Sequence, residues 1–178
     1  GCNARVDSEC DDDEQPGKNL YVDAFQIDVT EVTVEAFREC VRAGRCGEPG
    51  SGGSCNWGRE DRERHPANCV DWSQATTYCQ WKGKRLPSEW EWEKAARGTD
   101  GRKYPWGNES IGSGPKRANM ADRQTDFDWR LEGYDDGFAE TGPTAAYSAG
   151  TSPYGVHDLS GNVWEWTNSK YPGSSSRA

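Results

Sequence analysis

Apolar residues recur at helical spacing near the start of the chain. Val34, Phe37 and Val41 lie three and four positions apart, so a helix would place them on one face. Thr33 directly before them is a favoured N-cap residue, and Gly44 is a common residue just past a helix end. This pattern predicts a helix between residues 33 and 44 whose apolar face belongs to the core.

Two further short helices are predicted in the middle of the chain. Ser73 is the expected N-cap of the first, which would run over residues 74–82. Ser88 followed by Glu91 has the spacing of a capping box and predicts a second helix that ends near residue 97. The two helices would form a compact corner.

Alternating patterns predict extended structure at both ends of the chain. Residues 20–28 alternate well enough for a strand. Residues 155–167 interleave two Trp with Asp158 and Glu165, and a strand that buries the Trp face would turn Glu165 to the other side. One interpretation is that a bound cation stabilises these acids, and the alternative is a hairpin with an ordinary solvated Glu.

Between these elements the chain reads as long polar loops around a small core. Only 33% of the 178 residues are hydrophobic and the mean hydropathy is −1.04, yet nine Trp argue against a disordered chain. The 21 Gly and the aperiodic stretch 109–154 favour loops, which metal ions could keep ordered in place of a large core. The length suits one domain.

Charge and hydropathy exclude two classes of partner. The net charge of −9 would repel a phosphate backbone, so nucleic acid is not expected as a partner. No apolar stretch approaches the ~18 residues of a transmembrane helix, so no membrane span is expected. The first residues show neither a Met nor an apolar signal region, and a signal that had been removed would leave the same pattern.

Seven Cys favour disulfides over a zinc site, because no C-x-x-C pair is present. Disulfides predict a secreted or periplasmic protein. An odd count leaves one Cys without a partner in this chain. Connectivity cannot be read from the spacing, and the bridges considered are Cys2 with Cys10, Cys46 with Cys55, and Cys40 with Cys69.

Four segments in order resemble one known family. They are DAFQIDVTEVT at 23–33, the run from NCVDWSQATTYC to EKAARG at 68–98, YPWGN at 104–108, and SPYGVHDLSGNVWEWT at 152–167. Together they resemble the formylglycine-generating enzymes, also called sulfatase-modifying factors, over about residues 20–168.

The resemblance implies a fold and an activity. The implied fold class is α+β, a variant of the C-type lectin-like fold that is low in regular structure and stabilised by calcium. Residues 1–178 would then be a single domain, truncated at its C-terminus and slightly at its N-terminus. The implied activity is oxidation of a sulfatase cysteine to formylglycine with O2 and a copper(I) ion held by two thiolates, ligands that suit this soft ion. The implied partner is a sulfatase polypeptide or another protein ligand.

The copper ligands are not expected in this chain. In the family the cysteine pair that binds copper follows the WEW segment, and none of the residues from Cys2 to Cys79 matches it. The chain by itself is therefore not expected to catalyse the reaction. Cys79 resembles a family cysteine that bridges to one near the C-terminus, and the alternative is a free buried Cys.

Carried over by position, the resemblance implies two calcium sites, since calcium prefers six to eight oxygen ligands. The alternative is that these Asn and Asp residues form turns by bonding to their own backbone. The second site would use the Asp158 side chain, the Gly161 and Val163 carbonyls, and Glu165. The first would use Asn119, the Met120 carbonyl, Asp136 and the Phe138 carbonyl.

Five other residues have either two competing interpretations or no functional interpretation. Trp164 matches a Trp near the family's substrate groove, and the alternative is a core Trp. Arg85 and Glu91 are expected to form an internal ion pair in preference to a substrate contact. His65 and His157 are expected to be surface or loop residues and not ligands.

Three functions remain open for the parent protein. The first is a formylglycine-generating oxidase, and the second is a non-catalytic binding module of the same fold, since fold alone does not decide function. The third is a non-haem iron sulfoxide synthase, which would need His residues from an additional helical domain because this chain has only two His.

Overall fold

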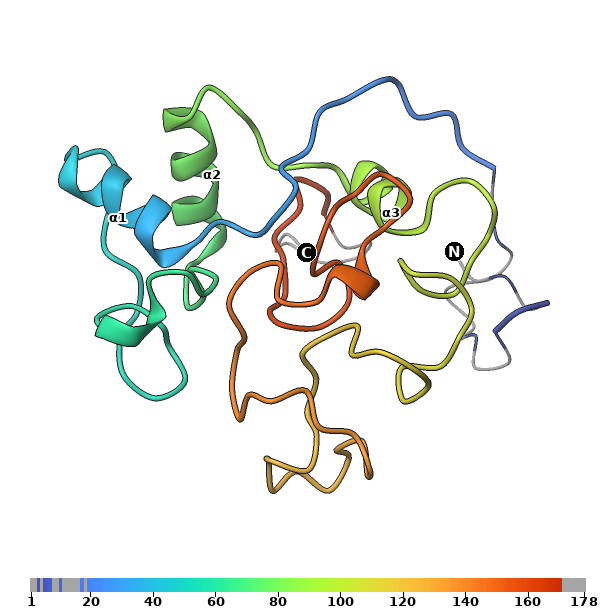
Figure 1. The fold of residues 1–178 in the computed structure, drawn as a ribbon. Coiled ribbons are helices and arrows are strands. Elements are labelled where there is room, and N and C mark those ends of the chain that lie inside the picture. Colours follow the sequence, from blue (N-terminus) through green and yellow to red (C-terminus); the bar gives the residue numbers. More distant parts are fainter. Residues whose placement is uncertain (1–2, 4, 8–9, 11–16, 18, 171–178) are drawn as a thin grey trace.

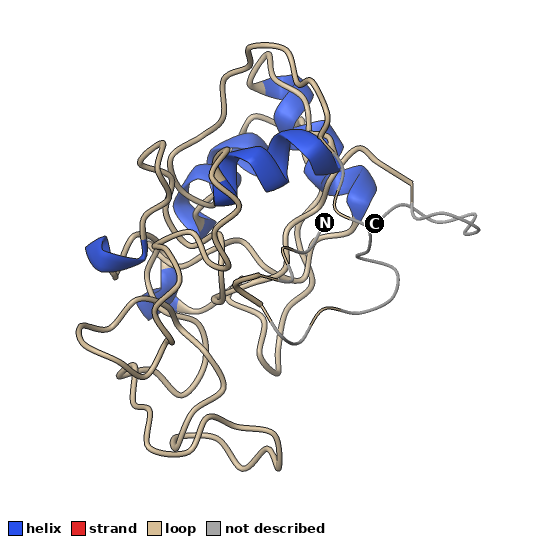
Figure 2. Cartoon of the chain, turned by 90° about the vertical axis from the view of Figure 1, so that its right-hand side faces the viewer, coloured by secondary structure: helices blue, strands red, loops and turns tan. Residues whose placement is uncertain are grey.

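The computed structural model describes residues 3, 5–7, 10, 17 and 19–170. Three α-helices stand out in the long loops of Figure 1, and Figure 2 shows no strand in the described part of the chain. Only two isolated β-bridges, Thr33 with Pro66 and Tyr104 with Gly107, occur among those residues. The elements are α1 Val34–Arg42, the 3-10 turn η2 Glu60–Arg62, α2 Trp72–Trp81, α3 Glu89–Arg97 and the 3-10 turn η3 Ser148–Gly150.

The helix α1 follows its sequence pattern. The Thr33 hydroxyl accepts a hydrogen bond from the Ala36 N–H at 3.1 Å, as an N-cap side chain should. Val34 and Phe37 are buried on the predicted face. Gly44 follows the helix with a φ of 66°, a left-handed conformation that favours glycine.

The helix α2 begins earlier than predicted. Its N-cap is Asp71, so the assignment of Ser73 as the cap was wrong. The Asp71 carboxylate accepts the Gln74 N–H at 2.7 Å, and the Gln74 side chain accepts the Asp71 N–H at 2.9 Å. A carboxylate also interacts favourably with the positive end of the helix dipole, which favours Asp71 over a serine two residues later.

The helix α3 confirms the capping box. Ser88 accepts the Glu91 N–H at 3.2 Å, and Glu91 accepts the Ser88 N–H at 2.8 Å. Gly98 caps the other end with a φ of 67°.

Neither predicted extended region forms a strand. Residues 20–28 are extended without pairing to any described strand, although Phe25 and Ile27 still pack on the core as their pattern predicted. Residues 155–167 form successive turns and not a hairpin, with left-handed φ values at Asp158 and Asn162. Bends therefore replace the predicted strand at 155–167, while residues 20–28 have no assigned regular structure.

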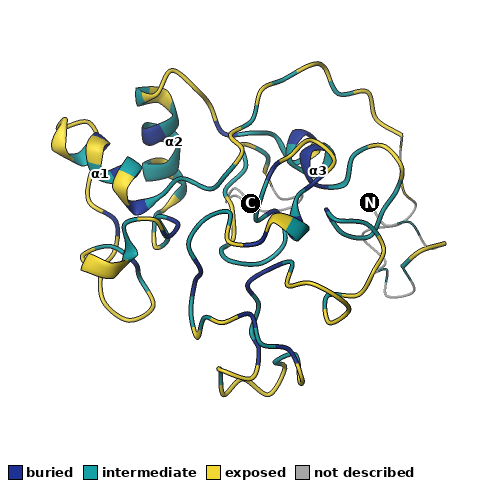
Figure 3. Ribbon diagram, in the orientation of Figure 1, coloured by how far each residue is buried: buried dark blue, intermediate teal, exposed yellow. Residues whose placement is uncertain are grey.

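Two small apolar clusters hold the fold. One joins α1 and α2, where the ring of Phe37 stacks on Tyr78 at 5.2 Å between centroids. The other joins Ala95 and Ala96 of α3 to Val156 and Leu159. The dark buried segments in Figure 3 are correspondingly short, which confirms a small core with long loops.

The disulfides differ from the bridges considered from sequence. Cys40 pairs with Cys46 and Cys55 pairs with Cys69, so the two alternatives that crossed these pairs were wrong. After Gly44 the chain turns back, and the N–H groups of the next two residues bond to the Cys40 carbonyl, which brings Cys46 beside it. This reversal leaves the Cα atoms of the pair 5.3 Å apart, a distance that a disulfide spans.

Cys10 is also disulfide-bonded, while Cys2 lies outside the described residues. Cys79 is a free cysteine. Disulfides fit an oxidising compartment. Among the described residues no helix has the length and apolar character needed to cross a bilayer.

Candidate metal centre

The four residues predicted for the second calcium site line one cavity of about 380 Å³. Asp158 and Gly161 have positive φ values, so the chain winds around this cavity and does not run past it as a strand. A Cβ added to Gly161 would lie 2.2 Å from the Asn119 carbonyl oxygen, and only glycine allows this close approach. The winding therefore brings together Asp158, Gly161, Val163 and Glu165.

The two acids of this group differ in their exposure to water, since Asp158 is half-buried and Glu165 is exposed. Asp158 accepts the Ala145 N–H at 2.6 Å, and burial raises the pKa of its carboxyl. Glu165 accepts the indole N–H of Trp92 at 3.1 Å and keeps an accessible surface along the cavity. Crowding by protein, with a smaller effect of the Asp158 charge, raises the pKa of Glu165 to about 7.

A third acid, Glu31, joins the group and was not predicted from the sequence. Its Oε2 accepts the side-chain N–H of Asn162 at 2.7 Å, while its Oε1 is buried with no hydrogen-bond donor among the described residues. Burial, followed by the negative charges of Asp158 and Glu165, raises the pKa of Glu31 to about 9. The sequence feature that could have identified Glu31 is its position as an acid within the apolar run just before the Thr33 cap.

The three acids repel one another, and no basic side chain is the compensating partner of Glu31 or Glu165 in the described structure. A buried carboxylate is costly without a partner. At the same time, no three His, Cys, Asp or Glu side chains among the described residues converge closely enough to form a complete metal cage. A cation here would therefore need backbone carbonyls as well, and calcium accepts such ligands.

The four residues predicted for the first site also lie together. Asp136 is only 3% exposed, and it accepts the N–H groups of Met120 at 2.7 Å and Phe138 at 2.8 Å. The amide of Asn119 donates to the same carboxylate at 3.2 Å. Burial raises the pKa of Asp136. Both of its oxygens have donors, so this acid depends less on a cation than Glu31 does.

The two groups form one polar unit. The Asn119 carbonyl accepts the Asn162 N–H at 2.9 Å, and Asn162 in turn donates to Glu31. A fully buried Asp122 accepts the Asp136 N–H at 2.6 Å on the other side. A charge placed in either group would therefore change the electrostatic potential at the other group.

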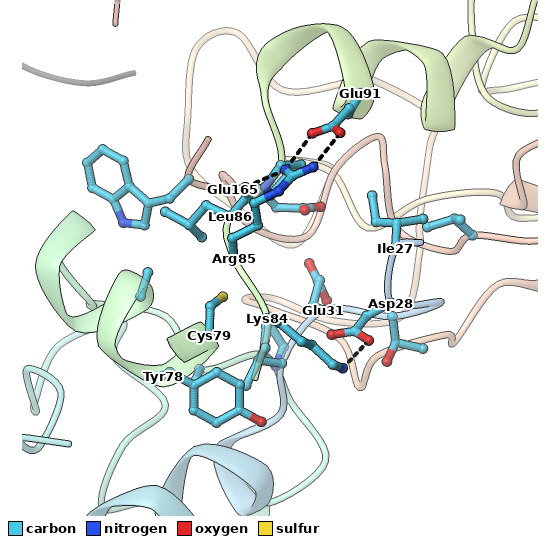
Figure 4. Close-up of a pocket in the computed structure, with 18 of the residues that line it drawn as sticks. Ile27, Asp28, Glu31, Tyr78, Cys79, Lys84, Arg85, Leu86, Glu91 and Glu165 are labelled. Carbon is cyan, nitrogen blue, oxygen red and sulfur yellow. Dashed lines mark hydrogen bonds and ion pairs between the residues drawn. The ribbon is translucent and has the colours of Figure 1, made fainter. Parts of the chain in front are cut away.

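A larger cavity of about 450 Å³ lies beside this unit, and Glu31 and Glu165 are among its lining residues. Figure 4 shows two ion pairs at this cavity. Arg85 binds Glu91 through two contacts of 2.7 Å, which confirms the predicted internal pair, and Lys84 binds Asp28 at 2.5 Å. The Arg85 guanidinium lowers the pKa of Glu91 to about 2.

The structure contradicts one of the two interpretations of Trp164 and one part of the prediction for His65. Trp164 is fully exposed, with a relative exposure of 102%, so it is not a core Trp. His65 lies in a loop as predicted but is buried, where Nδ1 approaches the Thr141 hydroxyl at 3.0 Å. Burial and the nearby Arg62 charge lower the pKa of His65. His157 lies in a loop and is half-buried.

The described cysteines do not fit a copper(I) site. Such a site needs two thiolates, and Cys79 is the unpaired cysteine among the described residues, since the others there are in disulfides. Burial also raises the pKa of the Cys79 thiol, which disfavours the thiolate. We derive no copper chemistry from this part of the molecule.

A sequence profile described as "Sulfatase-modifying factor enzyme 1-like domain" matches residues 1–176. The chain belongs to this family. The chain is 45% identical to the formylglycine-generating enzyme of Thermomonospora curvata over 107 residues, which are 60% of this chain and 34% of that protein. It is 43% identical to the mouse formylglycine-generating enzyme over 108 residues, 60% of this chain and 28% of that protein.

A similar likeness extends to an inactive relative. The chain is 43% identical to bovine inactive C-alpha-formylglycine-generating enzyme 2 over 115 residues, 64% of this chain and 36% of that protein. The chain thus spans about a third of the length of these curated relatives. Because active and inactive proteins match about equally well, this likeness assigns the family and not the catalytic state.

Proposed function

We propose that this chain is a calcium-stabilised part of a formylglycine-generating-enzyme-like protein with a C-type lectin-like scaffold. The observation that carries the proposal is the acid group of Glu31, Asp158 and Glu165. All three pKa values are raised, and Glu31 has a buried oxygen without a donor among the described residues. A divalent cation would supply the missing counter-charge.

The proposed calcium ligands are the carboxylates of Asp158 and Glu165 with the carbonyls of Gly161 and Val163. Glu31 lies close enough to add its charge. When bound, calcium would neutralise the acids and fix the turns that carry them. The protein's own contribution is to hold each carboxylate in place, through Ala145 for Asp158, Trp92 for Glu165 and Asn162 for Glu31.

A second calcium is proposed at Asn119, Met120, Asp136 and Phe138. The support is their convergence around one buried carboxylate whose pKa is raised by burial. Because this carboxylate already accepts three hydrogen bonds, we expect weaker calcium binding here than at the cavity lined by Glu165. The two sites would together order the loops from 118 to 165.

For the whole protein we propose oxidation of a sulfatase cysteine to formylglycine with O2 and copper. The family supports this function, while the thiolates for copper would have to come from outside the described part of the chain. Trp164 is proposed as a contact for the sulfatase peptide, and its full exposure makes it available. The disulfides support a secreted or periplasmic location.

The alternative is a non-catalytic binding module of the same fold. The 43% identity to an inactive bovine relative is the observation that favours it. The two functions are separated by assaying the parent protein, loaded with copper, on a cysteine-containing sulfatase peptide. A trapped aldehyde in the product supports the oxidase, and binding of the peptide without aldehyde formation supports the module.

Calcium binding is tested by titration calorimetry and thermal melting on the chain after chelation. We expect calcium to raise the melting temperature, and hydrogen exchange to slow in the loops from 118 to 165. Glu165→Gln should weaken calcium binding by at least about tenfold because a charged ligand is lost. Glu48→Gln, at an exposed acid that lines neither cavity, is the matched control and should bind as the parent does. An identical melt with and without calcium would remove the proposal.

A further inference from the structure

The loop between residues 121 and 136 is a closed structure held by its own contacts. The Leu131 N–H donates to the Ala121 carbonyl at 2.9 Å, and the Asp136 N–H donates to the Asp122 carboxylate at 2.6 Å. The Tyr134 hydroxyl anchors the base by donating to the Ala118 carbonyl at 2.8 Å. Compact loops of this kind with close ends are frequently functional.

The tip of this loop presents two aromatic rings to solvent. Phe127 and Trp129 stack with centroids 4.8 Å apart and an interplanar angle of 8°. Their exposures are 51% and 72%, which is unusual for large aromatic residues. A tight turn fixes the pair, because the Arg130 N–H donates to the Phe127 carbonyl at 3.1 Å. In Figure 3 the loop at the bottom is largely exposed.

Negative charge surrounds the ring pair. Asp126 and Asp128 alternate with the two rings, and both are exposed. The basic residues of the loop are engaged elsewhere: Arg123 pairs with Asp135, and Arg130 pairs with Glu132. No ion pair to Asp126 or Asp128 occurs within the described chain. The tip therefore combines an aromatic surface with two carboxylates that lack a basic partner there.

We propose that this tip is a docking site for a basic polypeptide segment. An Arg side chain of the partner would stack on the outer face of Trp129 by a cation–π interaction, and its charge would be matched by Asp126 and Asp128. An apolar partner would have to desolvate both carboxylates, and a nucleic acid would be repelled by them. This inference does not depend on calcium binding or on oxidase activity.

The test uses a fluorescent Gly/Ser peptide that carries several Arg residues, with a peptide of the same length that carries Gln as its control. Fluorescence anisotropy at low salt should show binding of the Arg peptide at least about tenfold tighter than the Gln peptide. Trp129→Ala should weaken binding of the Arg peptide by about fivefold or more. Trp129→Phe should retain most of it, because an aromatic face remains.

Two further variants divide the contributions. Asp126→Asn combined with Asp128→Asn should weaken the Arg peptide severalfold and reduce the effect of salt. Tyr154→Ala, which removes an exposed aromatic residue elsewhere, should leave binding unchanged. Thermal melting of each variant shows whether it is folded, and we expect small changes because the rings are exposed.

The proposal fails if Trp129→Ala binds the Arg peptide as the parent does, since attraction would then come only from the net charge of −9. Equal binding of the Arg and Gln peptides would also overturn it. So would binding to a neutral saccharide panel that Trp129→Ala abolishes while the Arg peptide is ignored, because the ring pair would then be a carbohydrate site.

Discussion

The region of α1 and α2 and the loops from 118 to 165 are ordered by different means. Around α1, Phe37 stacks on Tyr78 and meets Trp57 edge-on, while two disulfides close the neighbouring loops. The loops from 118 to 165 contain no α-helix and are organised around buried acids. Figure 1 shows these loops below and to the right of the helical pair.

The comparison teaches that one polar chain can offset the entropy of ordering loops in two ways. Apolar burial and disulfides act at any pH and need no ligand. Buried acids bring order only if their charge is compensated, so their contribution should change with pH and with calcium. The stability lost when each region is mutated should therefore depend differently on pH and on calcium.

The largest effect is expected from truncating the aromatic core. Phe37→Ala should lower the free energy of unfolding by about 3–5 kcal/mol, because Phe37 is 2% exposed and a cavity would remain. The loss should be the same with calcium and with chelator. Urea denaturation measures it, and Phe127→Ala is the matched control, expected to cost less than about 0.5 kcal/mol at an exposed site. A loss that vanished with calcium would mean that the two regions are not independent.

In the group of Glu31, Asp158 and Glu165, whether a substitution stabilises or destabilises the protein should depend on calcium. At pH 7 without calcium, Glu31→Gln should stabilise the protein by about 1 kcal/mol or more, because folding no longer has to protonate a carboxyl that is ionised in the unfolded chain. With calcium the same change should be destabilising, because the cation loses a nearby charge. Melting curves of the parent and of Glu31→Gln in both conditions measure the reversal. If the variant melts below the parent in both conditions, Glu31 is not part of a cation site.

The pH dependence should separate the regions again. The pKa values of Glu31 and Glu165 are raised to about 9 and about 7 in the folded protein, from 4.5. The folded state therefore holds more protons than the unfolded state above pH 4.5. The stability contributed by these bound protons is lost progressively as the pH rises from 4.5 through 7 for Glu165 and from 4.5 through 9 for Glu31. Without calcium, the melting temperature should fall over this range, and calcium should reduce the fall. A rising melting temperature there would contradict these pKa shifts.

The sequence predicted local features better than long-range ones. The Thr33 cap and the Ser88 capping box depend on neighbours three residues away, and both are observed. The cysteine pairing and the place of Glu31 depend on chain reversals, and these were wrong or missed. Glu31 meets Asn162 from 131 positions away, a contact that no local spacing encodes.

The smallest change in the free energy of unfolding is expected at the start of α2, where the local sequence pattern gave the wrong N-cap. Asp71→Ala should cost about 1 kcal/mol because Asp71 accepts the Gln74 N–H at the N-cap. Ser73→Ala should be neutral or stabilise by a few tenths of a kcal/mol, since Ser73 is the second helical residue and not the cap, and Ala has the higher helix propensity. Urea denaturation at one pH compares the two variants, with calcium present throughout. If Ser73→Ala proved the more costly change, the local pattern would have identified the cap correctly, and α2 would begin two residues later than observed.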